Sequence, residues 1–212
     1  MKVYFKTFGC RTNIYDTELL KSYVKTYEIT NDESVADIIV VNSCTVTNGA
    51  DSGVRNYINS MRNSGKKVIL TGCGAVSKGD ELFKSSAIFG VLGASNKSKI
   101  DEMLGKSEPF YELGDLNFID KNIVSNYENH TKAFIKIQEG CDFACSYCII
   151  PSVRGFSRSI DEDIILKEAK TLASNGYSEI VLTGTNIGSY GKGVGTSLGR
   201  LVARLGKING IK

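Results

Sequence analysis

Short apolar runs alternate with segments of helical periodicity along the first hundred residues of the chain. The apolar runs predict strands at 3–8, 37–41, 67–71 and 87–92. The periodic segments predict helices at 16–27, 53–62, 79–85 and 97–104. The run at 37–41 is apolar throughout, as in a strand buried on both faces. Four strand–helix units in series favour an α/β fold, a doubly wound parallel sheet with helices on both faces.

The alternation stops near residue 105 and resumes near residue 133. The segment 105–132 has no sustained period and predicts a connection, with a short strand around Phe118. Beyond it we expect a strand at 133–138, followed by a cysteine-rich loop and a helix that carries Ile165, Ala169, Leu172 and Ala173 on one face. A second strand at 178–183, a glycine-rich loop at 184–195 and a second helix at 197–206 follow. Ser159 stands in capping-box spacing to Glu162, which places the start of the first of these helices.

This pattern predicts a domain at 1–104, a connecting segment at 105–132 and a second domain at 133–212. Two strand–helix units cannot close a barrel or cover both faces of an open sheet. We therefore expect the second domain to be incomplete and the chain to be the N-terminal part of a longer protein.

Composition narrows the class of protein. The chain has 42% hydrophobic residues and 26 Lys+Arg against 23 Asp+Glu, a formal charge of +3. These values exclude a disordered polyelectrolyte and fall short of a strongly basic nucleic-acid binder. No apolar stretch approaches the ~18 residues of a membrane span, and the N-terminus lacks a signal-peptide core. A cytoplasmic protein follows, in which the six cysteines are not expected to form structural disulfides.

Three cysteines, Cys141, Cys145 and Cys148, form a C-x3-C-x2-C run directly after a predicted strand. Structural zinc usually takes four nitrogen or sulfur ligands, and no fourth cysteine or histidine lies nearby in the sequence. Three thiolates in a short loop instead suit three irons of a 4Fe–4S cluster, which leaves the fourth iron free to bind a ligand. Structural cysteines that happen to cluster are the alternative.

The other three cysteines are far apart in sequence but alike in position. Cys10, Cys44 and Cys73 each follow the end of a predicted parallel strand, at intervals close to the ~30 residues of a βα repeat. Parallel strands present their carboxyl ends at one edge of the sheet, where open α/β folds bind ligands. We therefore expect these cysteines to converge on one site; scattered core cysteines are the alternative.

The loop EGCDFACSYCIIP resembles the signature of the radical S-adenosylmethionine (SAM) superfamily, C-x3-C-x-aromatic-C, with Tyr147 as the aromatic residue. The resemblance implies a partial TIM barrel in which the open iron binds SAM and the cluster supplies the electron that yields a 5′-deoxyadenosyl radical. It also implies that Tyr147 lies near the adenine, and that Gly184, Thr185 and Asn186 bind the SAM amino group. A packed loop aromatic and an ordinary turn are the alternatives.

Four stretches distributed along the chain together resemble the methylthiotransferase family, whose members add a methylthio group to tRNA or to a ribosomal protein. They are TFGCRTNIYDTELL, VNSCTVTNGAD, TGCGA and FIKIQEGCDFACSYCIIPSVRGFSRS. The resemblance implies a flavodoxin-like methylthiotransferase domain followed by the first βα units of a truncated radical SAM barrel. All six cysteines fall on the family's cluster ligands. Cys10, Cys44 and Cys73 would hold an auxiliary 4Fe–4S cluster that carries the transferred sulfur.

Two cysteine motifs indicate a branch of this family. FGCRTNIYDTE and NSCTVT are most similar to enzymes that modify N6-threonylcarbamoyladenosine in tRNA, whose motifs typically read GCKVNxYDTE and NTCTVT. The isopentenyladenosine branch usually shows GCQMN and NTCSIR, and the branch that modifies a ribosomal-protein aspartate shows GCPKN and NTCGF. Arg11, Thr12, Ser43 and Gly74 depart from the first pattern, whereas the cluster ligands do not.

Polar residues near both cysteine sets are further candidates. Arg154 and Arg158 are placed to contact tRNA phosphates or the SAM carboxylate, with a solvated or salt-bridged loop charge as the alternative. Asn13, Asn42 and Thr45 are placed to hydrogen-bond the auxiliary sulfurs, with capping or turn roles as the alternative.

The sequence thus predicts a radical SAM enzyme that adds a methylthio group to carbon 2 of N6-threonylcarbamoyladenosine beside the tRNA anticodon. The resemblance implies two 4Fe–4S clusters and SAM as cofactors. The expected partners of this monomer are tRNA and an electron donor such as flavodoxin or ferredoxin. An iron–sulfur electron-transfer module is the alternative from another class; three ligands per cluster argue against it, because relays generally ligate all four irons.

Overall fold

The computed structural model describes residues 1–45, 48–128 and 130–211, and the chain divides into two compact units, Met1–Leu116 and Asn117–Lys212. Val46 and Thr47, in the motif after Cys44, lie outside the described residues. The strands of the first unit are β1 (Lys2–Thr7), β2 (Glu28–Ile29), β3 (Ile38–Ser43), β4 (Lys67–Gly72), β5 (Gly90–Leu92) and β6 (Phe110–Glu112). Its helices are α1 (Arg11–Tyr23), α2 (Asn48–Asn63), α3 (Cys73–Ser77), α4 (Gly79–Lys84) and α5 (Ile100–Leu104), with 3-10 turns η1 (Glu33–Val35) and η2 (Ala94–Lys99).

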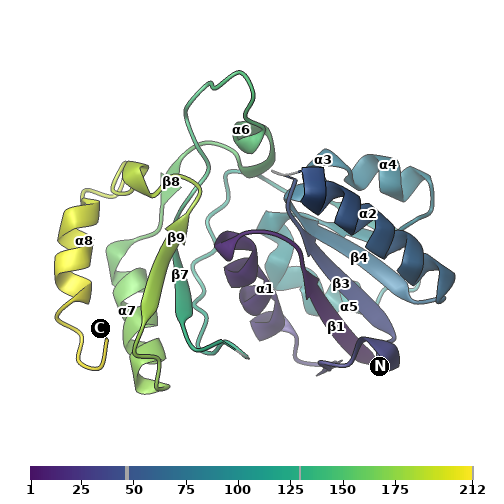
Figure 1. Cartoon of the computed structure of the whole chain (residues 1–212), viewed down its shortest axis with the longest axis horizontal. Helices are drawn as coiled ribbons and strands as arrows, with labels where there is room; N and C mark the ends of the chain where they lie inside the picture. The colour runs from purple at the N-terminus through teal and green to yellow at the C-terminus, as the bar shows by residue number, and fades with distance from the viewer. Residues whose placement is uncertain (46–47, 129, 212) are drawn as a thin grey trace. The chain divides into compact units, whose positions relative to one another are not determined.

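The first unit is built on one parallel sheet in the order β2-β1-β3-β4-β5-β6 (Figure 1). Strand β3 pairs with β1 on one side and β4 on the other, and all six of its residues are buried. This explains its continuous apolar run, because helices cover both faces of the sheet. The predicted α/β fold with a doubly wound parallel sheet is confirmed.

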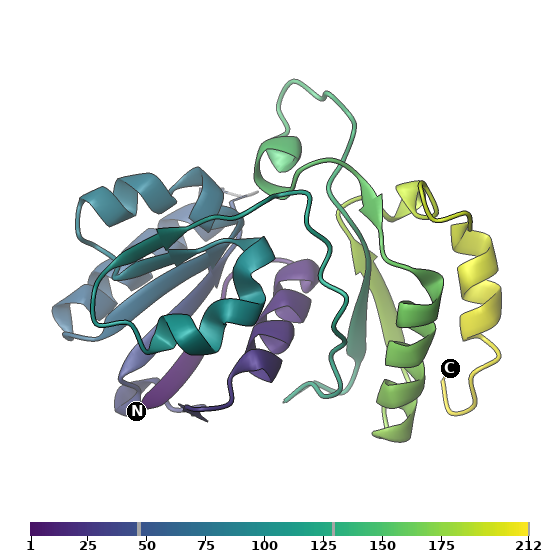
Figure 2. The ribbon, with the colours of Figure 1, turned by 180° about the vertical axis from the view of Figure 1, so that it is seen from behind.

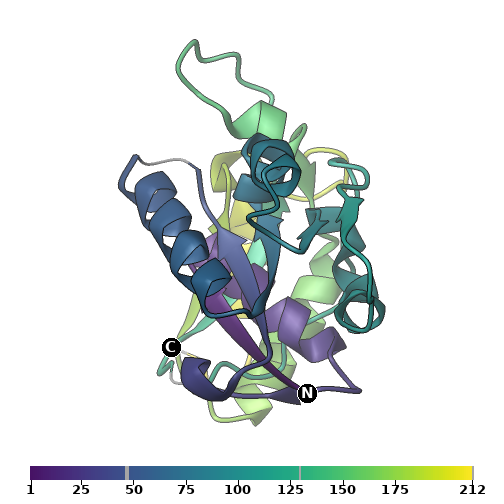
Figure 3. The same ribbon diagram turned by 90° about the vertical axis from the view of Figure 1, so that its right-hand side faces the viewer.

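Alternate residues of β3 enter two separate hydrophobic clusters. Ile39 and Val41 pack with residues of α2 and α3, whereas Ile38 and Val40 pack with residues of α1 and α5. Figure 2 shows α1 and α5 over one face of the sheet, and Figure 3 shows α2 on the other side of it. Full burial of each such side chain stabilises the fold by roughly 1.5–3 kcal/mol.

Helix α1 begins five residues earlier than the hydrophobic period predicts. Its first turns bury polar rather than apolar side chains, among them Thr12, Asn13 and Asp16. The fully buried Lys97 pairs with Asp16 at 3.4 Å. A pattern that counts apolar residues misses this start, because the buried face of the helix is polar there.

Two further local predictions were wrong. No strand forms at Phe118, which is 47% exposed, whereas the nearby β6 pairs with β5 and extends the first sheet. Ser159 does not cap a helix; it lies in a strand, and its hydroxyl accepts a hydrogen bond from the backbone of Gly191 at 3.0 Å. The helix that follows has Asp161 at its N-cap.

The second unit contains a three-stranded sheet in the order β8-β7-β9, with β7 parallel to β9 and antiparallel to β8. Its elements are β7 (Ala133–Glu139), α6 (Ile150–Arg154), β8 (Arg158–Ser159), α7 (Glu162–Ser174), β9 (Ile180–Gly184), η3 (Ile187–Ser189) and α8 (Leu198–Leu205). The β7–α7–β9 connection is the expected βα repeat. In the described part of both units, no helix combines the length and apolarity needed to cross a membrane.

Candidate functional site

The first unit brings Cys10, Cys44 and Cys73 to the same edge of its sheet. Cys10 follows β1 and is the N-cap of α1, Cys44 directly follows β3, and Cys73 directly follows β4 and opens α3. Because β1, β3 and β4 are neighbours, the three residues leave adjacent strands at their carboxyl ends. The side chains belong to neither hydrophobic cluster, and all three thiols are free of disulfides.

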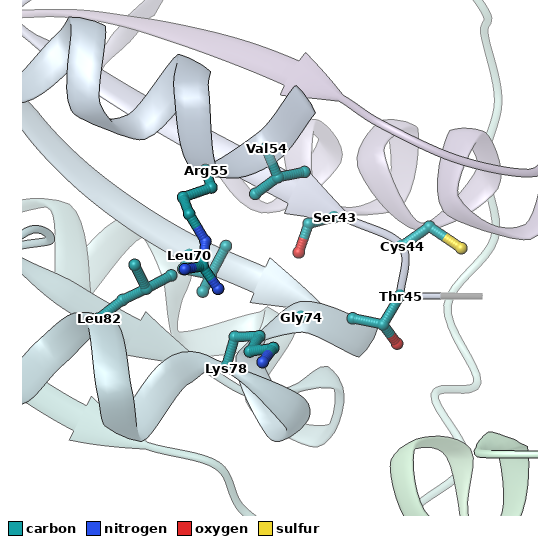
Figure 4. Close-up of a pocket in the computed structure, with 9 residues that line it drawn as sticks. All are labelled: Ser43, Cys44, Thr45, Val54, Arg55, Leu70, Gly74, Lys78 and Leu82. Atoms are coloured by element: carbon teal, nitrogen blue, oxygen red, sulfur yellow. The ribbon is translucent and has the colours of Figure 1, made fainter. Parts of the chain in front are cut away.

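These thiols differ in exposure. Cys10 is exposed, whereas Cys44 and Cys73 are buried. Cys44 also borders a small pocket with an apolar wall of Val54, Leu70 and Leu82, and Figure 4 shows its sulfur pointing away from that wall. Its position at the strand end, rather than in a hydrophobic layer, leaves the sulfur facing the edge where open α/β folds bind ligands.

An asparagine pair holds this edge of the sheet together. The Asn13 side-chain nitrogen donates to Asn42 Oδ1 at 2.9 Å and to the Ser43 carbonyl at 3.2 Å. In return, Asn42 Nδ2 donates to the Asn13 carbonyl at 2.9 Å and to Thr17 Oγ1 at 3.0 Å. The Cys10 thiol donates to Asn13 Oδ1 at 3.3 Å. Since both asparagines are at most 1% exposed, these amides are satisfied by protein rather than by water.

The second unit presents Cys141, Cys145 and Cys148 in the loop between β7 and α6, which extends beyond the sheet (Figure 1). Cys141 is buried at the base of the loop and Cys145 is exposed at its tip. The Cys141 N–H donates to the Gly155 carbonyl at 3.1 Å, which ties the two ends of the loop together. Tyr147 is 90% exposed, so its predicted contact with adenine stays a prediction.

A buried ion-pair cluster fixes the base of the loop. Glu139, at the end of β7, accepts from Arg154 Nη1 at 2.6 Å and from Lys136 Nζ at 3.1 Å. Arg158 Nη2 lies 3.5 Å from the same carboxylate. Arg154 is only 4% exposed and Arg158 is also paired, as in the salt-bridged alternative for these two arginines. Their contact with RNA or SAM stays a prediction.

The loop after β9 is joined to the cysteine loop through Gln138. The Asn186 N–H donates to Gln138 Oε1 at 2.7 Å, and Gln138 Nε2 donates to the Gly140 carbonyl at 2.7 Å. Asn186 Nδ2 lies 4.0 Å from Cys141 Sγ. The structure therefore brings the predicted SAM-binding turn, which begins at Gly184 and Thr185, beside the first cysteine of the loop.

The pKa of one carboxylate in the cysteine loop is lowered. The side-chain hydrogen bond from Lys192, followed by the Ser157 backbone N–H, holds the pKa of Asp142 below its ordinary value. Asp142 accepts from Lys192 Nζ and from the Ser157 N–H, and so links the cysteine loop to the glycine-rich loop of Lys192.

Gly140 supplies the turn that starts the cysteine loop, and we expect Gly140→Ala to lower stability by more than about 2 kcal/mol. Its φ is +76°, and an added Cβ would overlap the Phe156 carbonyl. Gly176→Ala is the matched control, since Gly176 has a φ of +91° but no atom within 4 Å of an added Cβ. Denaturant unfolding of both variants measures the difference; equal losses would contradict a steric role for position 140.

The two cysteine sets have the chemistry of metal-cluster ligands but not yet the geometry. Each set consists of three cysteines without a disulfide, on a single sheet edge or in a single loop, and thiolates are the donors of an iron–sulfur site. Among the described residues, however, no three Cys, His, Asp or Glu side chains are gathered closely enough to hold a metal ion. The structure thus brings three cysteines to each site without closing either set into a metal-binding group.

Comparisons with known proteins agree with this architecture. The profile "Radical SAM superfamily" matches residues 135–209, and "Uncharacterized protein family UPF0004" matches residues 2–93. The solved radical SAM methyltransferase TsrM of Kitasatospora setae has a TM-score of 0.59 at 14% identity, over 87% of this chain and 47% of its own. The second unit, with its three-cysteine loop, defines a radical SAM protein.

Proteins with similar sequences identify the family more closely. A Helicobacter pylori protein provisionally described as a methylthiotransferase is 51% identical over 100% of this chain and 51% of its own length. The threonylcarbamoyladenosine tRNA methylthiotransferase MtaB of Aquifex aeolicus is 39% identical over 100% of this chain and 54% of its own. The tRNA-2-methylthio-N(6)-dimethylallyladenosine synthase of Fervidobacterium nodosum is 33% identical over 100% and 51%. The chain belongs to the radical SAM methylthiotransferase family and spans about half the length of these relatives.

Proposed function

We propose that the protein adds a methylthio group to carbon 2 of N6-threonylcarbamoyladenosine in tRNA, with SAM and two 4Fe–4S clusters. The observation that supports this proposal is the partition of six cysteines, none of them in a disulfide, into two sets of three, one at a sheet edge and one in a loop. A single radical SAM cluster needs only the loop. A second three-thiol set suits a sulfur-donating centre, because one iron remains open in each cluster.

In this proposal the residues of the chain have separate tasks. Cys141, Cys145 and Cys148 would hold the cluster that binds SAM. When bound, this cluster and SAM together would supply a carbon-centred radical. Asn186, which lies beside Cys141, is placed to contact the amino-acid end of SAM. The protein's contribution is to orient these groups and to exclude water, since aromatic C–H bonds offer no acidic proton for acid–base catalysis.

In the first unit, Cys10, Cys44 and Cys73 hold the auxiliary cluster at the carboxyl edge of the parallel sheet. Cys44 and Cys73 would be its buried ligands and Cys10 its solvent-facing one. A cluster with one solvent-facing ligand is accessible to a sulfur source and to substrate. An electron donor such as flavodoxin or ferredoxin would reduce the SAM-binding cluster.

The substrate branch rests on the cysteine motifs and on similarity. The NSCTVT motif and the 39% identity to MtaB favour threonylcarbamoyladenosine. A second candidate is dimethylallyladenosine, because synthases that modify it reach 38% identity, over 90% of this chain. Arg11 and Thr12, which depart from the usual motif, lie in the first turn of α1 beside Cys10.

Nucleoside mass spectrometry of tRNA tests the proposal. Cells that lack the gene should lose 2-methylthio-N6-threonylcarbamoyladenosine, and the intact gene should restore it whereas a Cys44→Ala gene should not. Loss of the 2-methylthio group from the dimethylallyl nucleoside instead would assign the second candidate. If both nucleosides were unchanged, the tRNA proposal would be wrong and a ribosomal-protein substrate would be examined.

A further inference from the structure

The buried Asn13–Asn42 pair lies between the three cysteine-bearing turns of the first unit. We propose that Asn13 is a positioning residue of the auxiliary centre: its amide fixes the Cys10 turn against the Cys44 turn, so that the three thiols reach one metal site. The inference rests on the proposed role of these cysteines as ligands. It adds a residue that holds them in register without touching the metal.

The orientation of the Asn13 amide follows from its partners. Its nitrogen lies 3.2 Å from the Ser43 carbonyl, which accepts hydrogen bonds and cannot donate them. The NH2 group must therefore face Ser43, and the oxygen must face Cys10, whose sulfur is 3.3 Å away. The sulfur contact exists while Cys10 is a protonated thiol, whereas the Asn13 backbone N–H holds the Cys10 carbonyl at 2.9 Å whether or not the thiol is ionised. Asn13 thus joins the backbone of the Cys10 turn to the residue before Cys44.

Asn42 extends the same arrangement to the third cysteine. Gly72, the residue before Cys73, has a φ of +79°, and a Cβ there would overlap Asn42 Oδ1. Gly9, the residue before Cys10, has a φ of +134°, and a Cβ there would overlap the Cys44 side chain and approach Asn13 Oδ1. The glycines before Cys10 and Cys73 therefore allow the backbone to close around the asparagine pair.

Threonine hydroxyls of α1 and β1 also hold the Asn13–Asn42 pair. Thr17 Oγ1, one turn further along α1, lies 3.0 Å from the Asn13 carbonyl and 2.7 Å from Thr7 Oγ1 in β1. Asn42 Nδ2 lies 3.0 Å from the same hydroxyl. A buried network of this kind is rigid only when each member is satisfied. Replacing the Asn13 NH2 with a second oxygen would set one acceptor against two others, the Ser43 carbonyl and Asn42 Oδ1.

Cadmium titration isolates this effect from iron–sulfur chemistry. In the protein with Cys141, Cys145 and Cys148 changed to alanine, Cd²⁺ reports the remaining thiols by thiolate-to-metal charge-transfer absorption. We expect Asn13→Asp to weaken Cd²⁺ binding by about 10- to 100-fold, as for residues that orient metal ligands. At saturating Cd²⁺ the absorption should fall by about one third, as one thiolate of three is lost.

Two further variants make the test specific. Asn96→Asp is the control, because Asn96 is a half-buried asparagine of the same unit that donates to the Glu112 carbonyl at 3.3 Å; it should bind Cd²⁺ normally. Asn13→Gln keeps the amide but displaces it by one methylene, and it provides the measurement if Asn13→Asp does not fold. A folded Asn13 variant with unchanged affinity and full absorption would overturn the inference.

Iron reconstitution of the protein with all six cysteines separates this inference from the proposed function. If the parent protein holds a single 4Fe–4S cluster while Cd²⁺ affinity still depends on Asn13, the positioning role stands and the two-cluster proposal fails. If the parent holds two clusters and Asn13→Asp holds the same two with unchanged Cd²⁺ affinity, the positioning role fails and the two-cluster proposal stands.

Discussion

Cys141→Ala should abolish the reductive cleavage of SAM and halve the iron content, from about eight to about four atoms per chain. The reason is that Cys141 is one of only three thiols in its loop, and its backbone N–H is bound to Gly155 at the loop base. Anaerobic reconstitution, iron analysis and chromatography of 5′-deoxyadenosine measure both effects. Normal 5′-deoxyadenosine formation by this variant would contradict the assignment of the loop.

Cys44→Ala is the matched counterpart in the first unit. It should also lose about four irons, yet it should cleave SAM at the parental rate because the loop cluster is intact. Methylthio transfer should be absent. SAM-induced changes in the electron paramagnetic resonance spectrum should persist in Cys44→Ala and disappear in Cys141→Ala. Iron near zero with stoichiometric zinc in the parent protein would exclude both clusters.

Glu139→Gln should lower the stability of the second unit by about 3–5 kcal/mol. The Glu139 carboxylate is 7% exposed and pairs with Arg154 and Lys136, which are 4% and 2% exposed. Glutamine has nearly the same shape but no charge, so the buried cations lose their shared anion. Thermal unfolding followed by circular dichroism should show a fall of about 12 °C or more in the midpoint.

The control for this prediction is an exposed ion pair of the same unit. Lys132 and Glu179 lie 2.7 Å apart with side chains that are 53% and 47% exposed, so Glu179→Gln should change stability by less than about 1 kcal/mol. Glu139→Gln should also lower SAM cleavage, because the carboxylate fixes both ends of the cysteine loop. Equal midpoints for the two variants would show that the buried cluster does not stabilise the unit.

Hydrophobic period was enough to predict most of the fold but not its polar parts. The strand at 37–41 and the helix at 53–62 were found because their buried faces are apolar, as in β3 and α2. The start of α1 was missed because that helix buries Asn13 and Asp16. The short α3 was missed as well, since five residues give no recognisable helical period.

The candidate site, too, was predicted from the sequence only in part. The cysteine spacing placed Cys10, Cys44 and Cys73 at one sheet edge, because parallel topology makes strand ends equivalent. The role of Glu139 was not predicted. Lys136 lies three residues before Glu139 in β7, whereas Arg154 reaches it from α6. The pair with Arg154 leaves no local pattern in the sequence because it joins two elements. The signal in the sequence was a lysine and a glutamate within a strand whose other residues, apart from Gln138, are apolar.

The placement of the cysteines also determines when each donor set can exist during folding. Cys141, Cys145 and Cys148 lie within eight positions of one another, so an unfolded or partly synthesised chain already keeps them at high local concentration. Cys10, Cys44 and Cys73 meet only after β1 has paired with β3 and β3 with β4, which are slow, long-range steps. A denatured chain therefore retains a chelating loop but loses the dispersed set entirely.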